Sequence, residues 1–156
     1  MNRQFLSFTL GETLYAVEVD QVQEVLKYSQ PVRLPCTIDY VEGLISSRDQ
    51  GISVVNLRKK FDLPLESYTR KTRIIILETV TPEATQTITF GAIADSVEEV
   101  IELDDESIEA APKFGNTISG EYIRGIGKKD GKFIIILDID RVFSEEELNV
   151  LKSSAK

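Results

Sequence analysis

Apolar and polar residues alternate over short stretches of the chain, and turn residues separate these stretches from one another. In the segment Leu14–Val19, the side chains of Tyr15, Val17 and Val19 fall on one face, which is the period of a half-buried strand. We therefore predict that the chain is built mainly of strands. The other predicted strands are Phe5–Leu10, Glu24–Lys27, Val41–Ser46, Ile52–Asn56, Arg73–Glu78, Thr87–Ala94, Glu99–Glu102, Tyr122–Gly127 and Phe133–Asp138.

One helix is predicted near the end of the sequence. Ser144 and Glu147 have the spacing of a capping box, in which each side chain bonds the backbone N–H of the other residue. Leu148 and Leu151 fall on one face of the turns that follow. The pattern predicts a terminal helix over Glu145–Lys152.

Two copies of one pattern occupy the two halves of the chain. Each copy has a strand-rich block, then a proline, then a Tyr-x-x-Gly block, and then a phenylalanine 18 residues after that glycine. Because the blocks recur in the same order, with an offset that grows from 75 to 82 residues, we interpret them as an internal duplication. The paired blocks are 15–26 and 90–101, Pro35 and Pro112, 40–43 and 122–125, and Phe61 and Phe143.

The duplication predicts two small β barrels of about five strands each, because closing each sheet removes the exposed edges of so small a unit. The first subdomain is expected over about residues 5–79 and the second over about 86–143, with a helix and tail in 144–156. The stretch Thr79–Gln86 between them has no apolar period. Two possibilities remain for the N-terminal strand, which can stay in its own lobe or cross into the other.

The charge of the chain argues against nucleic acid and membrane surfaces as partners. Its 156 residues include 26 acidic and 18 basic residues, a formal net charge of −8, which repels phosphate backbones and anionic headgroups. The longest apolar run, Phe133–Leu137, is far shorter than the ~20 residues of a spanning helix, and the N-terminus lacks the apolar core of a signal peptide. We therefore expect a cytoplasmic protein that does not insert into the membrane.

The residue types that most catalytic and metal sites need are scarce. The chain has no histidine, the commonest general base and metal ligand, and its single cysteine, Cys36, cannot form an internal disulfide. The acidic run from Glu98 to Glu109 lacks the Asp-x-Asp-x-Asp-Gly spacing of a calcium loop, and Asp138 and Asp140 have no nucleophile nearby. No catalytic residue, metal site or cofactor is predicted.

Several segments together resemble the CheW family of chemotaxis coupling proteins. The run Phe8–Val25 reads Phe-x-Leu-Gly-x-x-x-Tyr-x-Val-x-Val-x-x-Val-Gln-Glu-Val. The further matching elements are Gly43-Leu44-Ile45-x-x-Arg48, Val54-x-x-Leu57-Arg58-x-x-Phe61, Asp95-x-Val97-x-Glu99-Val100, Ala111-Pro112 and Glu121-Tyr122-Ile123-x-Gly125. The resemblance runs from residue 4 to about residue 151, and its specificity lies in the order and spacing of the elements.

The resemblance implies two intertwined, five-stranded, SH3-like β subdomains with short helices, in a single CheW-like domain over residues 4–151. It also implies an adaptor without catalytic activity, which bridges the cytoplasmic tip of a chemoreceptor (a methyl-accepting chemotaxis protein) to the regulatory domain of the histidine kinase CheA. That domain is itself similar to CheW, so the two proteins, and further CheW copies, can assemble into rings in arrays near the inner membrane. The alternative is a small β-barrel ligand-binding protein or hydrolase.

The resemblance places a receptor-binding site on Val22, Glu24, Val25, Leu26 and Arg48. The first four residues lie in a stretch that contributes to an apolar groove for the receptor's helical hairpin, with charges at the rim. The alternative for Val22 and Val25 is ordinary barrel core, and we expect Glu24 and Leu26 to be more exposed than Val22.

Arg48 lies in a turn where the family has an Arg-Gly pair, and a guanidinium is suited to carboxylates and carbonyls at an interface. The matching residue in the second half is Asp130, so the barrel itself does not require the arginine. Asp49 replaces the family's glycine, and we expect this turn to have a different backbone in which Asp49 can pair with Arg48. The alternative for Arg48 is a solvated turn residue.

A second site, for the kinase or for another coupling subunit, is implied at Glu109, Lys113 and Phe114. These residues lie in a connection around Pro112, where Phe114 is a candidate aromatic anchor for an interface. The alternative is that Phe114 packs under this loop into the second barrel.

Overall fold

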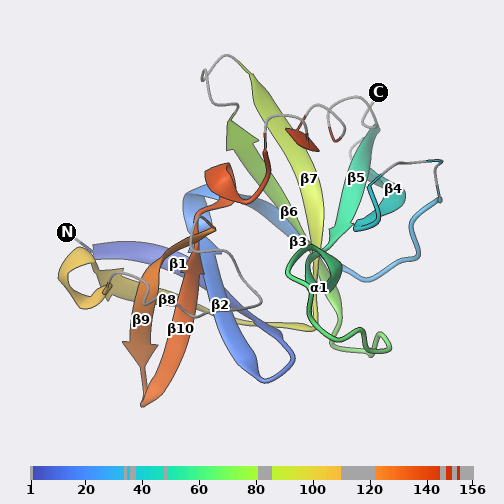
Figure 1. Cartoon of the computed structure of the whole chain (residues 1–156). Coiled ribbons are helices and arrows are strands. Elements are labelled where there is room, and N and C mark those ends of the chain that lie inside the picture. The colour runs from blue at the N-terminus through green and yellow to red at the C-terminus, as the bar shows by residue number, and fades with distance from the viewer. Residues whose placement is uncertain are drawn as a thin grey trace.

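The computed structural model describes residues 2–33, 35, 38–47, 49–80, 86–109, 122–144, 147–148 and 151. Within these residues, ten strands form two five-stranded sheets that lie next to each other (Figure 1). Sheet 1 has the order β8-β1-β2-β10-β9 and consists of β1 (Asn2–Leu10), β2 (Thr13–Glu18), β8 (Ser96–Asp104), β9 (Ile123–Lys129) and β10 (Lys132–Leu137). Sheet 2 has the order β3-β6-β7-β5-β4 and consists of β3 (Val22–Lys27), β4 (Val41–Ser47), β5 (Gln50–Asn56), β6 (Arg73–Val80) and β7 (Thr87–Ala94). The short helices are η1 (Val19–Gln21), α1 (Leu57–Lys60), η2 (Asp105–Ser107) and η3 (Ile139–Arg141).

The mainly β fold with two five-stranded subdomains is confirmed. Every strand predicted from the sequence is present, and most of them extend slightly beyond the predicted bounds. Strand β5, for example, begins at Gln50 rather than Ile52, because the ladder continues to the pair Ser47–Gln50 beside the hairpin turn. The alternation of apolar and polar side chains does not predict how far the hydrogen bonding between two strands continues toward a turn.

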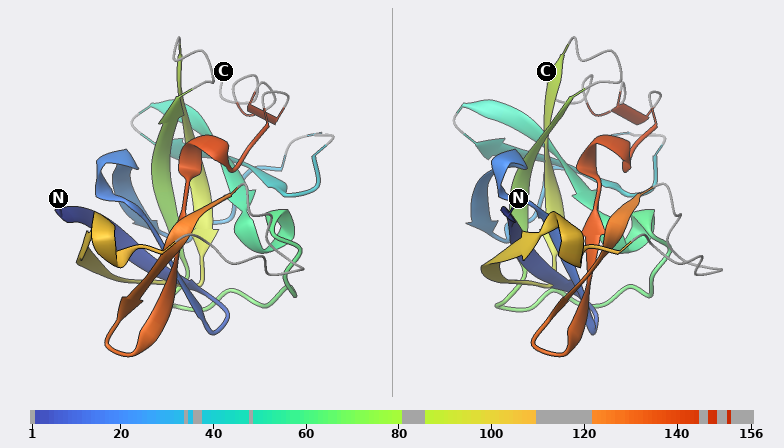
Figure 2. Two further views of the ribbon diagram at one scale, coloured as in Figure 1. Left: turned by 60° about the vertical axis from the view of Figure 1, so that its left-hand side comes forward. Right: turned by 90° about the vertical axis from the view of Figure 1, so that its left-hand side faces the viewer.

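The two sheets are built by a reciprocal exchange of strands between the two halves of the chain. Strands β1 and β2 lie with β8, β9 and β10, while β6 and β7 lie with β3, β4 and β5. Figure 2 shows this by colour, since the blue start of the chain lies beside its orange end in sheet 1. The N-terminal strand therefore crosses to the strands of the second half, and β2 crosses with it. Strand β6 falls in the predicted first stretch, about 5–79, and β7 in the second, about 86–143, so each sheet takes strands from both stretches, and these subdomain bounds stay a prediction.

The register of the strands follows the duplication. Each sheet contains one parallel pair, β2 with β10 in sheet 1 and β7 with β5 in sheet 2. Tyr15 lies opposite Ile135 in the first pair and Phe90 lies opposite Ser53 in the second, which are equivalent positions of the two repeats. Because a parallel pair cannot be closed by a tight hairpin, each of these pairs joins segments that are distant in the sequence.

A shared core holds the two sheets together. The largest cluster of buried apolar side chains takes residues from both sheets and from the segments that connect them. Aromatic rings of the two repeats pair in this cluster and against it, with Tyr40 on Phe143 and Tyr122 on Phe61, each at 5.9 Å between ring centroids. Burial of these large rings supplies much of the apolar stabilisation, and it ties the two repeats into one unit.

The predicted capping box is present at the end of the chain. The Ser144 N–H donates to Glu147 Oε1 at 2.9 Å, and the Glu147 N–H donates to Ser144 Oγ at 3.2 Å. Leu148 and Leu151 are buried in the shared core, and Lys60 Nζ donates to Glu147 Oε2 at 2.8 Å. Most of the predicted terminal helix lies outside the described residues, so its extent stays a prediction.

Candidate functional site

Four of the residues expected to bind the receptor lie on β3, at the edge of sheet 2. This strand pairs with β6 on one side, and its side chains alternate between half-buried and exposed. Val22 packs against the shared core, and Leu26 packs against the smaller apolar cluster inside sheet 2. Val25 points the other way and is 39% exposed. The edge strand therefore presents an accessible valine between two side chains that are anchored in the protein.

The structure bears on one expectation and on one open alternative about the burial of these residues. We expected Glu24 and Leu26 to be more exposed than Val22, but all three side chains are half-buried. Val25 is not a core residue. The reason is the register shift between Val22 and Glu24: Val22 lies with Leu77 on the face of the shared core, whereas Glu24 and Leu26 lie on the opposite face, beside Ile76 and Ile74 of the smaller cluster.

A hydrogen bond links β3 to the hairpin between β4 and β5. Ser47 Oγ donates to Glu24 Oε2 at 3.3 Å, and Ser47 directly precedes Arg48 in the sequence. Arg48 itself lies outside the described residues. The hairpin that carries the candidate arginine thus starts beside one of the candidate residues on β3. Sequence reasoning did not single out Ser47, because nothing in its own pattern indicates a partner 23 residues away.

The turn at Asp49 keeps a backbone conformation that glycine favours. Asp49 has φ +65°, and Gly131, at the matching place in the other hairpin, has φ +80°. Both values lie in the left-handed region, which aspartate tolerates better than most residues with a side chain. Arg48 lies outside the described residues, so the expected change of this turn relative to the family, and its pairing with Asp49, stay predictions.

The second candidate site belongs to sheet 1. Glu109 is exposed and forms a two-way backbone bridge to Ile126 on β9, at 2.9 and 2.8 Å. Gly125 permits this approach, because a Cβ at that position would lie 2.7 Å from Glu109 O. Lys113 and Phe114 lie outside the described residues. Within the described residues, the two candidate sets are therefore carried by different sheets.

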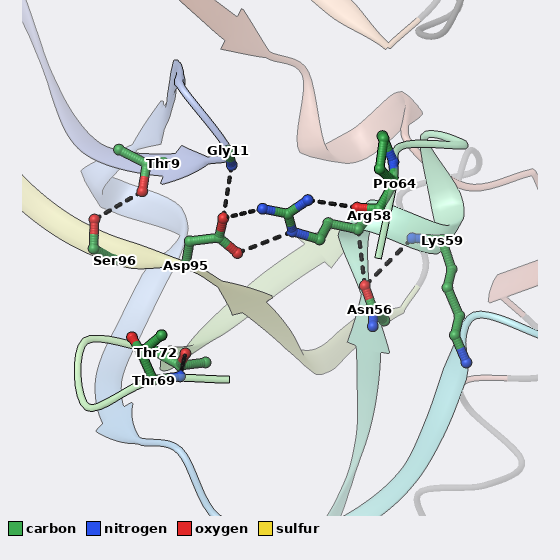
Figure 3. Close-up of polar contacts among 10 residues, drawn as sticks. All are labelled: Thr9, Gly11, Asn56, Arg58, Lys59, Pro64, Thr69, Thr72, Asp95 and Ser96. Atoms are coloured by element: carbon green, nitrogen blue, oxygen red, sulfur yellow. Dashed lines mark hydrogen bonds and ion pairs between the residues drawn. The ribbon is translucent and has the colours of Figure 1, made fainter. Parts of the chain in front are cut away.

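Sequence reasoning missed an ion pair at the connection from β7 to β8 (Figure 3). Arg58 Nε donates to Asp95 Oδ1 at 3.1 Å, while Arg58 Nη2 bonds Asp95 Oδ2 and Nη1 bonds the carbonyl of Pro64. The N–H of Gly11 also donates to Asp95, at 2.6 Å. Burial alone would raise the pKa of Asp95, but the hydrogen bonds from Arg58 and Gly11 lower it below its ordinary value. Both charged residues lie in the quoted motifs, yet their spacing of 37 residues does not predict their contact.

Asp138 and Asp140, the candidate carboxylate pair, have structural partners. Asp138 Oδ1 accepts from the Asp140 N–H at 3.2 Å and caps the helix η3. Burial and the nearby charge of Asp140 raise the pKa of Asp138. Asp140 Oδ1 accepts from Thr79 Oγ1 at 2.7 Å and from Gln21 Nε2 at 3.0 Å. These contacts fix the connections of the fold.

An open hollow of about 350 Å³ lies in sheet 1, between β8 and the hairpin of β9 and β10. Its floor includes Leu14 and Ile134, and its charged lining includes Glu99 and Lys129. Across the described part of the chain, no group of three or more Cys, Asp or Glu side chains is arranged to hold a metal ion. The same part contains no helix long and apolar enough to cross a membrane.

Comparisons with known proteins agree with these features. The family model of the CheW-like domain matches residues 4–147. The chain is 32% identical to the chemotaxis protein CheW of Klebsiella aerogenes, over its whole length and 90% of that protein. It is also 32% identical to the chemotaxis protein CheW of Treponema pallidum, covering 95% of this chain and 86% of that one.

A solved structure has the same fold. The crystal structure of the scaffolding protein TtCheW from Thermoanaerobacter tengcongensis superimposes with a TM-score of 0.83, at 34% identity, over 96% of this chain and 94% of the other. The likeness spans both sheets and the crossings between them, as the family match spans nearly the whole sequence. The chain therefore belongs to the CheW family.

Proposed function

We propose that this protein is a non-catalytic coupling protein of chemotaxis, which bridges the cytoplasmic tips of chemoreceptors to the histidine kinase CheA. It would work in the cytoplasm, in arrays near the inner membrane, where further copies of the chain can join the rings. The proposal rests on the membership of the whole chain in the CheW family, whose named members act in chemotaxis and include a scaffolding protein. No cofactor is needed for this role.

The observation that supports the bridging role is that the candidates on β3 and Glu109 lie on different sheets. The receptor candidates on β3 lie at the edge of sheet 2, and Glu109 pairs with β9 in sheet 1. Two partners on different sheets can bind at once, and the shared core makes the link between them stiff. Each contact can be small and weak, because the lattice of an array supplies avidity.

The receptor surface that we propose uses Val25 as its apolar contact. Leu26 and Glu24 hold the strand beneath it, and Arg48 would add a charge at the rim. A helical hairpin fits such an edge because a few aliphatic anchors, with charges around them, set its position and register. The kinase or coupling-subunit surface would combine Glu109 with Lys113 and Phe114.

Binding measurements with purified partners test the proposal. The Val25→Asp variant should bind a receptor cytoplasmic fragment at least about tenfold more weakly, because it places a charge at the apolar contact, and should bind the CheA regulatory domain normally. Val100→Asp is the matched control, since Val100 has the equivalent position on β8 and is 54% exposed. Phe114→Ala should show the opposite selectivity.

Isothermal titration calorimetry at tens of micromolar protein gives the affinities for both partners. If the unaltered protein binds neither the receptor fragment nor the CheA domain, the coupling function is wrong. If Val25→Asp and Val100→Asp weaken receptor binding equally, β3 is not the receptor surface.

A further inference from the structure

Strand β3 begins at one of the two places where the chain crosses between the sheets. Strand β2 lies in sheet 1, and η1 carries the chain from its end at Glu18 directly to Val22 in sheet 2 (Figure 1). The register of β3 with β6 shifts between Val22 and Glu24, so Gln23 forms a bulge immediately after the crossing. The way β3 presents its side chains therefore depends on how this crossing is held.

One carboxylate oxygen joins several segments at this crossing, where Gln21 Nε2 also donates to the Glu78 carbonyl at 3.4 Å. Asp140 Oδ1 accepts hydrogen bonds from Gln21 Nε2 at 3.0 Å, Thr79 Oγ1 at 2.7 Å and the Val80 N–H at 3.4 Å. Gln21 is the last residue of η1, and Thr79 and Val80 end β6, the strand that pairs with β3. Asp140 lies in η3, directly after β10 of sheet 1. Asp140, which follows β10 of sheet 1, thus joins Gln21 just before β3 to the end of β6, the strand that pairs with β3.

The other crossing, from β7 to β8, has an equivalent polar clamp, which means a charged side chain that links the crossing to neighbouring strands through hydrogen bonds. Arg58 follows β5 as Asp140 follows β10, and both lie two residues after a capping side chain, Asn56 or Asp138, that accepts their N–H. Arg58 bonds Asp95 at the crossing, and Asp95 accepts from Gly11 at the turn after β1. The duplication therefore retains a polar clamp at both crossings although the residues differ in charge. This recurrence points to a role in the crossing itself.

We propose that Asp140 is a positioning residue for β3, which acts through Gln21 and Thr79 and sets how Val25 is presented to the receptor. The part that concerns the receptor rests on the proposed function. The positioning of β3 does not, because it follows from the hydrogen bonds alone.

Hydrogen exchange of the full-length protein tests the positioning directly. In Asp140→Ala, the amides of residues 22–27 should exchange about tenfold faster, while those of β9 and β10 keep their protection, because the crossing loosens locally. Asp140→Asn should restore protection, since its amide oxygen can accept the same bonds. Gln21→Ala, which removes a donor from the other side, should act like Asp140→Ala. Asp20→Ala is the matched control, an exposed aspartate of the same crossing.

Receptor binding provides the second measurement. Asp140→Ala should bind a receptor cytoplasmic fragment about fivefold more weakly, and Asp140→Asn should recover most of that loss, with the CheA domain bound normally by both. If exchange in β3 is unchanged in Asp140→Ala, or rises equally in every strand, the positioning role is wrong. If the unaltered protein does not bind the receptor fragment, the proposed function fails, and the exchange data still decide the role of Asp140.

Discussion

Asp95 shows how one side chain can hold a crossing between two sheets. Its carboxylate accepts from Arg58 and from the backbone of Gly11, while its own N–H donates to the carbonyl of Thr9 at 2.9 Å. The Arg58 side chain is only 9% exposed, so little water reaches the guanidinium and its positive charge is compensated by the Asp95 carboxylate. Removing one member of such a pair leaves a poorly solvated charge behind.

We expect Asp95→Asn to lower the free energy of unfolding at pH 7 by about 2 kcal/mol, because the amide lacks the negative charge that compensates Arg58, and its nitrogen cannot accept the hydrogen bond from Arg58 Nε. Urea denaturation followed by circular dichroism measures the change. Glu12→Gln, at an exposed carboxylate beside Gly11, should have almost no effect. An equal loss in both variants would mean that net charge, not the ion pair, is responsible.

The same ion pair should make stability depend on pH. The pKa of Asp95 is lower in the folded protein than its ordinary value, so the unfolded chain binds a proton more readily. The stabilisation is therefore fully present above about pH 4 to 5 and is lost as the pH falls through the folded pKa. The difference in unfolding free energy between the unaltered protein and Asp95→Asn should shrink from pH 7 to pH 3. A constant difference would contradict this account.

At the scale of elements, Gly43 and Gly125 allow the two hairpins to pack closely against the backbone of neighbouring segments. Gly43 on β4 has φ +144°, and a Cβ there would lie 2.1 Å from the carbonyl oxygen of Val32. Val32 and Leu44 exchange backbone hydrogen bonds at 2.8 and 2.9 Å, as Glu109 and Ile126 do in the other sheet. Backbone atoms leave no room for a side chain at this point.

Gly43→Ala should therefore destabilise the protein by about 3 kcal/mol or more, through the clash with the Val32 carbonyl and the strained φ. Gly51→Ala is the control on the partner strand β5, where the nearest atom would be the flexible Leu44 side chain at 3.6 Å. Thermal unfolding of both variants measures the difference. Equal melting temperatures for the two would show that the bridge to Val32 moves aside at little cost.

At the scale of the whole molecule, the exchange of strands makes each sheet depend on both halves of the chain. The shared core takes side chains from both sheets, and each sheet also encloses a smaller apolar cluster of its own. Partial unfolding of one sheet would expose the core of the other. The two subdomains should therefore behave as one thermodynamic unit.

We expect a single cooperative unfolding transition. Ile101→Ala in sheet 1 and Ile74→Ala in sheet 2, both at buried positions, should each lower the one transition by about 2–5 kcal/mol and leave it two-state. Coincidence of the tyrosine fluorescence and far-ultraviolet circular dichroism curves in urea tests this, since the chain has five tyrosines and no tryptophan. Separate transitions for the two variants would show that the sheets unfold independently.

Local pattern was sufficient to find the elements and the duplication. The alternation around Tyr15, the spacing of Ser144 and Glu147, and the repeated Tyr-x-x-Gly blocks all depend on residues near one another in the chain, and strands, caps and hairpins are decided at that range. The family resemblance, which the comparisons confirm, also lies in the order of such local motifs.

The local pattern does not indicate which residues from distant segments of the chain come into contact in the fold. The exposure of Val25, the contact of Ser47 with Glu24 and the pair of Arg58 with Asp95 all arise from how distant segments are brought together. The alternation of β3 specifies two faces, but only the packed sheet decides which face is covered.

The amino-acid sequence by itself determined the ten short strands that the described residues form and their division into two related sets, because those properties are local. Only the tertiary structure decided that the sets exchange strands, that each crossing carries a polar clamp, and that the candidates on β3 and Glu109 lie on different sheets. The physical reason is that parallel pairing and core burial select partners by fit in space, and identical strand patterns are compatible with several such arrangements.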